Sequence, residues 1–355
     1  MNITIPNSVL DNILTSLQPF LDKKDSSQIT SHIYLEIRDG QLICKATDFE
    51  IGLSVTTDAL NIKEDGIATV NGKQVLDIIK RLKEGDVNLY TNNENLHIQQ
   101  NKSSFKLPMF NAQEFPTFPE YENLAKLEIN SLELITSMKK IFPVIDTNNQ
   151  RRELNGALLD IKEYSYNFIA TDTKRLAMIK FDKPSGKNLA LIFPKRAITE
   201  IQKLFFDQVK LFFNEQNIII KSQNYVFFSQ LINGKFPDYE KILPKEIVIE
   251  LAIPKAKIIE GIKVINSVTN DVKITFKSNE ILFESLSQNN SEAKTQVEME
   301  LPITEEIEVG VNSRHILDFL TQIDTADFIW GLNGKNAPFV LKSENFSTVV
   351  MPIIL

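Results

Sequence analysis

The amino-acid sequence predicts an α+β fold in which one unit of antiparallel strands and two helices occurs three times. Helix-like patterns that follow an isoleucine recur at Ile5, Ile129 and Ile253, which lie 124 residues apart. The triplet Ala-Thr-Asp recurs at the same interval, at 46–48 and at 170–172. Between these patterns, short runs alternate apolar and polar residues and are separated by turn residues, which is typical of hairpins. This interval is too long for a solenoid repeat and fits a small domain.

The first helical pattern of each unit has its apolar residues on one face. In the first unit these residues are Val9, Leu10, Ile13, Leu14 and Leu17. Asn7 or Ser8 is expected to cap the start of this helix, because short polar side chains accept hydrogen bonds from the first free backbone amides. A second amphipathic pattern begins near Lys73, Lys195 and Arg314 in the three units. Both helices of a unit are therefore expected to pack on an apolar layer and to leave one face in water.

The remaining segments predict strands. Clear examples are 33–47, 209–222 and 272–285, where alternating runs are broken by turn residues such as Asp-Gly and Ser-Asn-Glu. A parallel sheet would require a helix between most strands, and the sequence has too few helical patterns. Each unit is thus expected to be a sheet with two helices on one face. The expected domains, one for each unit, are 1–124, 125–246 and 247–355.

Composition limits the class of protein. Cys44 is the only cysteine among 355 residues, so no disulfide can form within the chain, and this fits a reducing compartment. The N-terminal residues lack the basic start and apolar core of a signal peptide. No apolar run approaches the roughly 20 residues that cross a bilayer. The chain is therefore expected to be cytoplasmic and to have no membrane partner.

Catalytic and metal sites are not predicted. The three histidines, His32, His97 and His315, have no metal-like spacing. Asp48 and Asp172 occupy equivalent places in two units, which favours a role in a turn over acid or base chemistry. The sequence has neither a P-loop nor a dinucleotide fingerprint. A nuclease would need clustered carboxylates for Mg²⁺, and the acidic residues are scattered. We therefore expect no enzyme activity, no cofactor and no bound metal.

Charge is unevenly distributed along the sequence. The chain carries a formal charge of −7, which by itself argues against a nucleic-acid partner. The six predicted helices together carry net positive charge, however, and the remainder is acidic. If the helices share one side of an assembly, that side attracts phosphates without reading bases. The alternative is that lysine and arginine are good helix formers on solvated faces, and charge alone does not separate the two interpretations.

Five motifs resemble one protein family. They are RRELNGALLDI at 151–161, ATDTKRLA at 170–177, LINGKFPDYEKILPK at 231–245, EIEVGVNSRHILDFL at 306–320 and VVMPIIL at 349–355. In this order they resemble the bacterial β sliding clamps, the processivity subunits of DNA polymerase III. The resemblance implies a head-to-tail homodimer that closes as a ring of six units, with helices on the inner wall and sheets on the outer wall. Duplex DNA would pass through the ring.

The resemblance implies a sequence-nonspecific contact with double-stranded DNA. Mobile Lys and Arg side chains would meet phosphates across water, so that every register along the duplex has a similar energy. The candidates, by resemblance and by charge, are Lys24, Lys73, Lys80, Arg81, Arg151, Lys195, Arg196 and Arg314. The rival interpretation is a repeat-built protein-interaction scaffold without a DNA role. Retention on circular but not linear DNA would separate a clamp from that scaffold.

The resemblance also implies a pocket between the second and third units for short peptides. Its partners in the family are the catalytic subunit of the replicative polymerase, the clamp loader, repair polymerases and other proteins with a clamp-binding motif. The matching positions here are Leu154, Thr171, Thr173, Lys174, Arg175, Leu176, Pro237, Lys241, Ile242, Val349, Met351, Pro352, Ile353 and Leu355. The apolar chain end supports this assignment, because chain ends are usually frayed. Departures from the family pattern alter the pocket rim at Glu153, Thr173, Lys174 and Ile354.

The ring joint is expected between the first unit of one copy and the third unit of the other. Phe105 and Leu107 match the edge strand of the first unit, and Ile265 is the expected apolar partner. An ion pair is expected across this joint, from Lys106 to Glu298 or Glu300.

Overall fold

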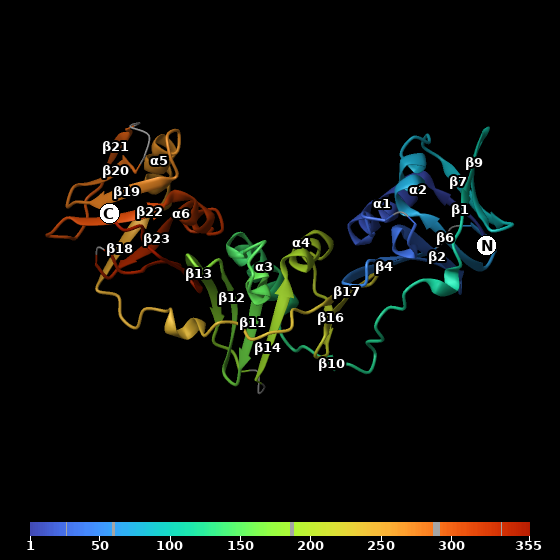
Figure 1. Ribbon diagram of the computed structural model, residues 1–355, viewed down its shortest axis with the longest axis horizontal. Coiled ribbons are helices and arrows are strands. Elements are labelled where there is room, and N and C mark those ends of the chain that lie inside the picture. The colour runs from blue at the N-terminus through green and yellow to red at the C-terminus, as the bar shows by residue number, and fades with distance from the viewer. Residues whose placement is uncertain (26, 59–60, 185–187, 287–291, 335) are drawn as a thin grey trace. The chain divides into compact units, whose positions relative to one another are not determined.

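The computed structural model describes residues 1–25, 27–58, 61–184, 188–286, 292–334 and 336–355. Within these ranges the chain forms four antiparallel sheets and six α-helices (Figure 1). The chain separates into two compact units. The first comprises Met1–Leu132 and Thr199–Leu231, and the second comprises Glu133–Ile198 and Ile232–Leu355. No helix in the described ranges combines the length and the apolar character needed to cross a membrane.

The first unit contains two sheets. One has the strands β1 (Asn2–Pro6), β5 (Asn61–Glu64), β7 (Asp86–Asn92), β8 (Asn95–Gln100) and β9 (Ser103–Pro108), in the order β5-β1-β7-β8-β9. The other has eight strands, β2 (His32–Arg38), β3 (Gln41–Thr47), β4 (Ile51–Asp58), β6 (Gly66–Asn71), β10 (Ala125–Lys126), β15 (Lys210–Phe213), β16 (Asn217–Lys221) and β17 (Tyr225–Gln230). Their order is β10-β15-β16-β17-β4-β3-β2-β6.

The second unit also contains two sheets. Its eight-stranded sheet consists of β11 (Gly156–Lys162), β12 (Ser165–Thr171), β13 (Arg175–Phe181), β14 (Leu189–Pro194), β18 (Ile249–Pro254), β23 (Asp327–Leu332), β24 (Phe339–Ser343) and β25 (Phe346–Val350). The order is β14-β11-β12-β13-β25-β24-β23-β18. The four-stranded sheet consists of β19 (Asp271–Phe276), β20 (Glu280–Ser285), β21 (Lys294–Glu298) and β22 (Ile307–Asn312), in the order β21-β20-β19-β22.

Both eight-stranded sheets join strands from successive repeats. β17 of the second repeat pairs with β4 of the first, with Tyr225 opposite Val55. β13 of the second repeat pairs with β25 of the third, with Leu176 opposite Val349. The predicted α+β class is confirmed, but each repeat contributes strands to two sheets, not to one. The alternation of apolar residues gives strand positions and faces, and it carries no information about which sheet edges pair.

Six α-helices among the described residues accompany the sheets. They are α1 (Asn7–Leu17), α2 (Gly72–Ile79), α3 (Ser131–Ile141), α4 (Lys195–Leu204), α5 (Lys255–Ile265) and α6 (Ser313–Leu320). Short 3₁₀ turns are η1 (Gln18–Phe20), η2 (Ile29–Ser31), η3 (Ala112–Glu114), η4 (Phe142–Val144), η5 (Arg152–Asn155) and η6 (Tyr239–Lys241). α1 contacts α2 in the first unit, and α5 contacts α6 in the second. The predicted apolar face of α1 is buried, apart from the half-buried Val9.

The start of α1 differs from the prediction. The residue before the helix is Pro6, and no side chain caps it. The Asn7 side-chain amide instead donates hydrogen bonds to the carbonyl groups of Ile79, Leu82 and Lys83, at 3.0–3.2 Å. The expectation that Asn7 or Ser8 caps α1 is therefore wrong, because the buried Asn7 amide satisfies the carbonyl group of Ile79, the last residue of α2, and those of Leu82 and Lys83 in the turn that follows. Sequence spacing does not reveal this long-range partner.

The two Ala-Thr-Asp segments form the same turn. In each, the Thr hydroxyl (Thr47 or Thr171) accepts a hydrogen bond from the amide two residues later and donates to the carbonyl four residues later, at 2.7–3.1 Å. The following carboxylate (Asp48 or Asp172) accepts hydrogen bonds from the amides two and three residues later, at 3.0–3.1 Å. The predicted role of these aspartates in a turn is confirmed. Such self-contained hydrogen bonding is typical of Asx and Ser/Thr turns.

The residue after each of these aspartates has left-handed backbone geometry. Phe49 has φ of 74° and Thr173 has φ of 72°. A β-branched residue rarely adopts this conformation, because its Cβ substituents crowd the backbone carbonyl. Thr173 therefore stores local strain in the turn between β12 and β13.

Thr173→Gly is expected to stabilise the second unit by about 0.5–1 kcal/mol. Glycine adopts positive φ without the steric cost of about 1–2 kcal/mol, but it also increases the conformational entropy of the unfolded chain, which offsets part of this stabilisation. Thermal unfolding followed by calorimetry measures the change. Lys174→Gly is the control, since Lys174 is in the same turn without positive φ, and it is expected to lower the melting temperature. A melting temperature of Thr173→Gly at or below that of the wild type would show that the positive φ of Thr173 does not destabilise the protein.

Candidate partner-binding groove and DNA-facing residues

A row of four buried residues crosses the eight-stranded sheet of the second unit. Thr171 lies opposite Leu176, Leu176 lies opposite Val349, and Val349 lies opposite Val340. Directly opposed residues of antiparallel strands share one face of the sheet. Each of the four is at most 7% exposed. The structure therefore brings three predicted pocket residues, from three adjacent strands, onto a single face.

Apolar residues of the segment after Ile232 cover this face. Leu154 and Leu176 belong to one buried cluster with Phe236 and Tyr239. Pro237 lies between the last two in sequence and is half-buried. Phe236 and Tyr239 were not predicted as site residues, although both stand in the motif that contains Pro237. Their large apolar side chains beside a proline are the signal that sequence reasoning missed.

The outer part of this segment is exposed. Ile242 is 40% exposed, and Lys241 pairs with Asp238 at 2.8 Å on the surface. An exposed isoleucine beside a buried apolar cluster offers contact area to another molecule. We name this surface, formed by Leu154, Thr171, Leu176, Pro237, Ile242, Val349, Met351, Pro352 and Ile353, the partner groove.

Arg175 does not line the partner groove. Its guanidinium pairs with Asp172 at 3.0 Å and with Asp318 of α6 at 2.7 Å, and it donates to the Pro143 carbonyl at 3.0 Å. Side chains alternate between the faces of a strand, so Arg175 and Leu176 point to opposite sides of β13. Arg175 thus lies on the opposite face of β13 from Leu176, and its assignment to the pocket stays a prediction. The side chain is 6% exposed and links the strand to the α6 side of the sheet.

The final residues of the chain run along the partner groove. The Met351 amide donates to the Lys174 carbonyl at 2.9 Å, and the Ile353 amide donates to the Gly310 carbonyl at 2.7 Å. Met351 is 47% exposed, and Pro352 and Ile353 are half-buried. Ile354, one of the expected departures from the family pattern, is 83% exposed. The chain end is thus ordered by backbone hydrogen bonds and presents apolar side chains.

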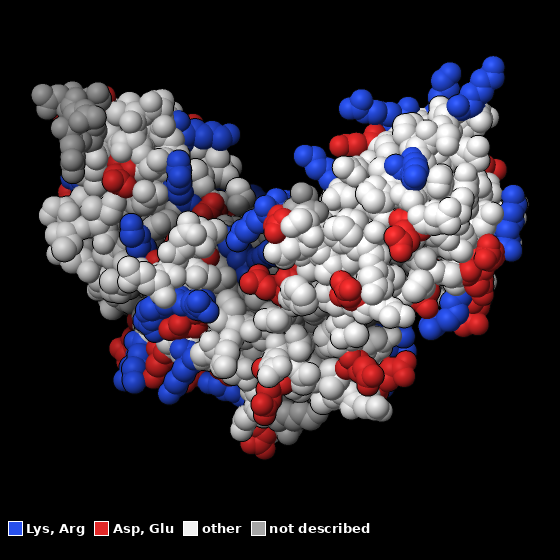
Figure 2. Space-filling view, turned by 45° about the vertical axis from the view of Figure 1, so that its right-hand side comes forward, with Lys and Arg blue, Asp and Glu red and all other residues white. Residues whose placement is uncertain are grey.

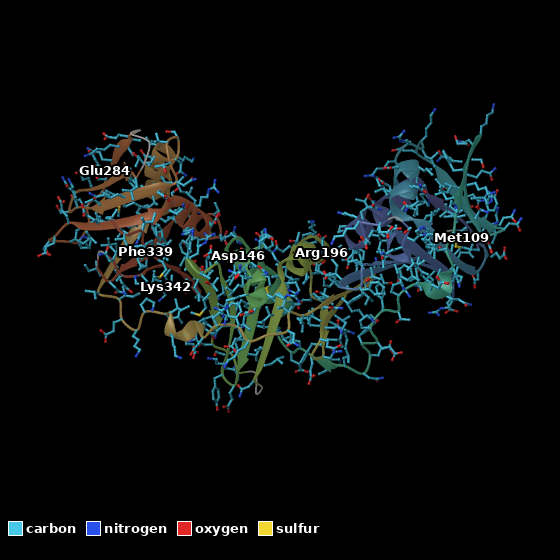
Figure 3. All side chains as sticks on the ribbon, viewed as in Figure 1. Met109, Asp146, Arg196, Glu284, Phe339 and Lys342 are labelled. Carbon is cyan, nitrogen blue, oxygen red and sulfur yellow. The ribbon has the colours of Figure 1, made fainter. Side chains whose placement is uncertain are left out.

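A polar cavity of about 310 Å³ adjoins the turn that contains Thr173 and Lys174, both of which are exposed. It is lined by Ile145, Asp146, Thr147, Asp172, Lys174 and His315. Asp146, labelled in Figure 3, accepts a hydrogen bond from the Asn149 side chain, which lowers the pKa of its carboxyl group. Burial lowers the pKa of His315. Asp146 and His315 were not predicted as site residues: Asp146 lies in none of the five motifs, and from the motif at 306–320 only Arg314 was taken as a site residue.

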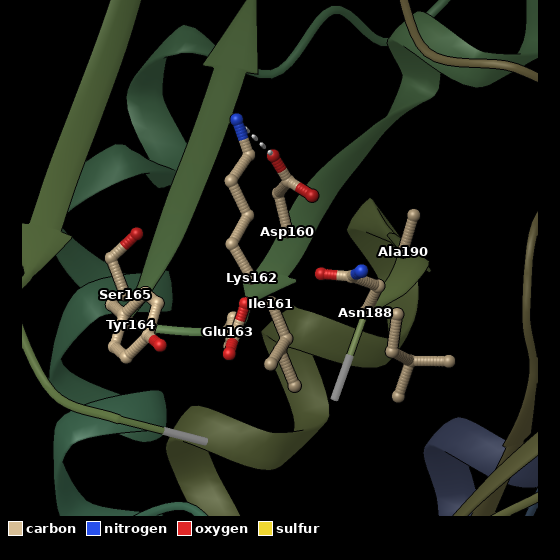
Figure 4. A pocket seen from close by; sticks show the side chains of 9 residues that line it. Asp160, Ile161, Lys162, Glu163, Tyr164, Ser165, Asn188 and Ala190 are labelled. Carbon is tan, nitrogen blue, oxygen red and sulfur yellow. Dashed lines mark ion pairs between the residues drawn. The ribbon is translucent and has the colours of Figure 1, made fainter. Parts of the chain in front are cut away.

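A second cavity, of about 680 Å³, lies at the turn between β11 and β12 (Figure 4). It is lined by Asp160, Ile161, Lys162, Glu163, Tyr164, Ser165, Asn188, Leu189 and Ala190. Lys162 and Asp160 form an ion pair at 3.7 Å on its wall. None of the predicted site residues lines this cavity.

The predicted DNA-facing residues are exposed with one exception. Those on the surface are Lys24, Lys73, Lys80, Arg81, Arg151, Arg196 and Arg314. On α2, the exposed side carries Lys73, and Lys80 follows at the helix end, while Val75 and Ile79 are buried. Figure 2 shows Lys and Arg side chains projecting from the surface among scattered acidic ones. Arg151 also pairs with Glu153 at 3.0 Å.

Lys195 has a structural partner. Its ammonium group donates to the Ile145 carbonyl at 2.6 Å and lies 5.2 Å from the centre of the Phe142 ring. Burial lowers its pKa. Lys195 therefore ties the start of α4 to the residues after η4. Its neighbour Arg196, labelled in Figure 3, is exposed and is the better candidate for contact with phosphates.

The residues predicted at the ring joint differ in their exposure to solvent. Phe105 and Leu107 are half-buried on β9. Ile265 is 0% exposed and packs inside its own unit, so the expectation that it contacts a second copy is wrong. Helical spacing cannot tell which apolar residue faces the core when the helix has apolar residues on two sides. The same helix and the turn after it expose Val264 and Val268, at 48% and 40%.

Comparison with known proteins covers the whole chain. Residues 1–119 match the N-terminal domain, residues 128–238 the central domain and residues 240–354 the C-terminal domain of the family described as DNA polymerase III beta subunit. A relative named beta sliding clamp from Helicobacter pylori is 40% identical over 100% of both chains. Another from Buchnera aphidicola is 26% identical over 100% of this chain and 99% of its own.

Solved structures agree with these matches. The crystal structure of the Helicobacter pylori beta clamp bound to a DNA ligase peptide has a TM-score of 0.95 and 39% identity, and the match covers 100% of both chains. A sliding clamp from Pseudomonas aeruginosa bound to griselimycin has a TM-score of 0.93 at 24% identity, which shows a shared fold. The chain belongs to the family of the DNA polymerase III beta subunit, the beta sliding clamps.

Proposed function

We propose that two copies of this chain close into a ring around duplex DNA and tether the replicative polymerase to it for processive synthesis. The observation that carries the proposal is the full-length match, at 40% identity, to a relative named beta sliding clamp. Three clamp domains per chain, with the bounds 1–124, 125–246 and 247–355, give six in the ring. The polymerase synthesises DNA and the clamp loader hydrolyses ATP, so the clamp itself is not an enzyme. A role on the chromosome places it in the cytoplasm.

Unpaired sheet edges support head-to-tail closure. Successive repeats join through edge strands, β17 with β4 and β13 with β25. The corresponding edges that have no neighbour in the described chain are β9 in the first repeat and β21 in the third. An unpaired strand edge offers amides and carbonyl groups to another chain. β9 of one copy therefore pairs with β21 of the other, and two such joints close the ring.

Apolar side chains flank this proposed joint. Phe105 and Leu107 stand on β9, and α5 lies against β21. Val264 and Val268 take the place of Ile265 as the apolar partners of the joint, because they are exposed. Lys106 is exposed on β9, and it pairs in the dimer with Glu298 or Glu300, which are also exposed.

The DNA contact is electrostatic and independent of base sequence. Exposed Lys and Arg side chains attract phosphates, and long flexible side chains follow the duplex as it moves. No base contact is required, so the interaction energy is about the same at every position along the duplex. The residues proposed for this contact are Lys24, Lys73, Lys80, Arg81, Arg151, Arg196 and Arg314, with Lys195 in a supporting role.

The partner groove binds short peptides of the replicative polymerase, the clamp loader and repair proteins. The similar Helicobacter pylori beta clamp has been solved with a DNA ligase peptide bound. Buried apolar residues beside an exposed Ile242 and Met351 suit such peptides, because methionine adapts its shape to different partners. Thr173, Lys174, Lys241 and Leu355 are placed at the rim of this groove.

Retention on circular DNA tests the proposed function. The protein is loaded onto nicked circular DNA by a clamp loader and passed through gel filtration at moderate salt. The wild type is expected to remain on the circle and to leave after the DNA is linearised. Arg196→Glu combined with Arg314→Glu is expected to shorten the retention time at least fivefold, because each reversal replaces attraction to phosphate with repulsion.

Lys210→Glu combined with Lys342→Glu is the matched control. It makes the same change in net charge at exposed residues of β15 and β24, and its retention is expected to stay within twofold of the wild type. Equal loss in both double variants would overturn the assignment of Arg196 and Arg314. Equal retention of the wild type on circular and linear DNA would favour a protein-interaction scaffold over a clamp.

A further inference from the structure

The chain end is attached to the outer edge of the four-stranded sheet. β22 is an edge strand of that sheet, and Ile353 forms an isolated antiparallel bridge to Gly310 on it. Two residues earlier, Met351 is attached to the Lys174 carbonyl. Pro352 lies between these two attachments and has a fixed φ, which makes the link between them stiff. The chain end is thus held at two points, one on each side of Pro352.

Gly310 makes the second attachment possible. A Cβ atom at this position would lie 2.6 Å from the Ile353 carbonyl oxygen and 2.9 Å from the Leu355 Cδ2 atom. The first of these is a backbone atom, so a side chain at Gly310 requires the chain end to move. The φ angle of Gly310 is not in the left-handed region, so β22 itself accepts other residues. The space for the chain end is therefore the reason for glycine here.

We propose that Gly310 is a positioning residue for the partner groove. It holds the chain end against β22 and so fixes Met351, Pro352 and Ile353 as one wall of the groove. This inference rests on the proposed function, and it adds a residue that touches no peptide itself. Without the attachment at Gly310, the wall is held only at Met351. A peptide must then order the wall when it binds, and ordering side chains and backbone weakens binding.

Peptide affinity tests the proposal. The probe is a fluorescein-labelled DNA ligase peptide of the kind bound to the Helicobacter pylori clamp, and fluorescence anisotropy gives its dissociation constant. Gly310→Ala is expected to weaken binding about tenfold, while dimerisation and retention on circular DNA stay unchanged. Gly331→Ala is the matched control in the same unit, because the three atoms nearest to its new Cβ all belong to the Ile247 side chain, the first of them at 2.9 Å. The control is expected to stay within twofold of the wild type.

A second variant separates positioning from general damage. Ile353→Pro removes the amide that donates to Gly310 and keeps an apolar side chain. Gly310→Ala is expected to weaken peptide binding less than twofold further in this background, because both changes break the same attachment. A full tenfold effect of Gly310→Ala in the Ile353→Pro background would overturn the proposal.

Hydrogen exchange tests the attachment without any peptide. Mass spectrometry of fragments that contain residues 351–355 is expected to show one protected amide fewer in Gly310→Ala than in the wild type. Unchanged protection would overturn the proposal. If the wild type does not bind the peptide, the proposed peptide-binding function fails, and the exchange result still decides whether Gly310 anchors the chain end.

Discussion

Phe105→Ala combined with Leu107→Ala is expected to convert the proposed ring into monomers. Both side chains lie on the unpaired edge strand β9 and are half-buried in the single chain. Burying the rest of such side chains in a joint contributes about 1–2 kcal/mol each, and the ring has two identical joints. The double variant therefore loses about 4–8 kcal/mol of dimer stability. This corresponds to a rise in the dimer dissociation constant of about three to six orders of magnitude.

Sedimentation velocity at micromolar concentration measures this change. Phe206→Ala combined with Val248→Ala is the control, because it removes two apolar side chains that are exposed elsewhere, at 73% and 76%. The control is expected to remain dimeric and to stay on circular DNA, whereas the β9 variant leaves the circle. A dimer that persists in the β9 variant would refute the edge-to-edge joint and require another surface for ring closure.

Ile242→Ala combined with Met351→Ala is expected to weaken binding of the DNA ligase peptide by about 100-fold. These residues are 40% and 47% exposed, so both have accessible apolar area to lose when a peptide binds. Each truncation removes about 1–2 kcal/mol of apolar contact with the peptide. Processive synthesis by the polymerase is expected to fail even though the ring still encircles DNA.

Peptide affinity and retention on circular DNA are measured on the same protein. Ile354→Ala is the matched control, since Ile354 is in the same chain end and is 83% exposed outside the proposed wall. It is expected to bind the peptide within threefold of the wild type. An equal loss in Ile354→Ala would mean that the chain end acts through bulk hydrophobicity, and no loss in the double variant would place the peptide elsewhere.

The repeat was the part of the fold that the sequence predicted best. Helix positions and turn chemistry depend on local residues, so the α1 pattern and the turns at Asp48 and Asp172 could be read from spacing alone. The row formed by Thr171, Leu176 and Val349 matched predicted pocket residues, because each stands in a motif with a strong local signal.

The differences between prediction and structure share one physical cause, which is contact with residues far away in sequence. Arg175 stands in the same motif as Asp172, but its guanidinium also forms an ion pair with Asp318 of α6. Lys195 has the local sequence of a surface cation, but in the structure its ammonium group donates a hydrogen bond to the Ile145 carbonyl. Asn7 is in position to cap α1, but its side-chain amide donates to the carbonyl groups of Ile79, Leu82 and Lys83, at the end of α2 and just after it. Ile265 is apolar like its exposed neighbour Val264, and only packing separates them.

Because each eight-stranded sheet contains strands from two repeats, the chain cannot be divided into fragments at the repeat boundaries without breaking a sheet. The central repeat contributes β17 to one eight-stranded sheet and β13 to the other, so each of these strands has a neighbour from another repeat. A fragment limited to 125–246 would expose both strands along their full length. Bare strand edges recruit other chains and promote aggregation. Recombinant fragments of this protein should therefore keep each eight-stranded sheet whole and should not end at the boundaries of its repeats.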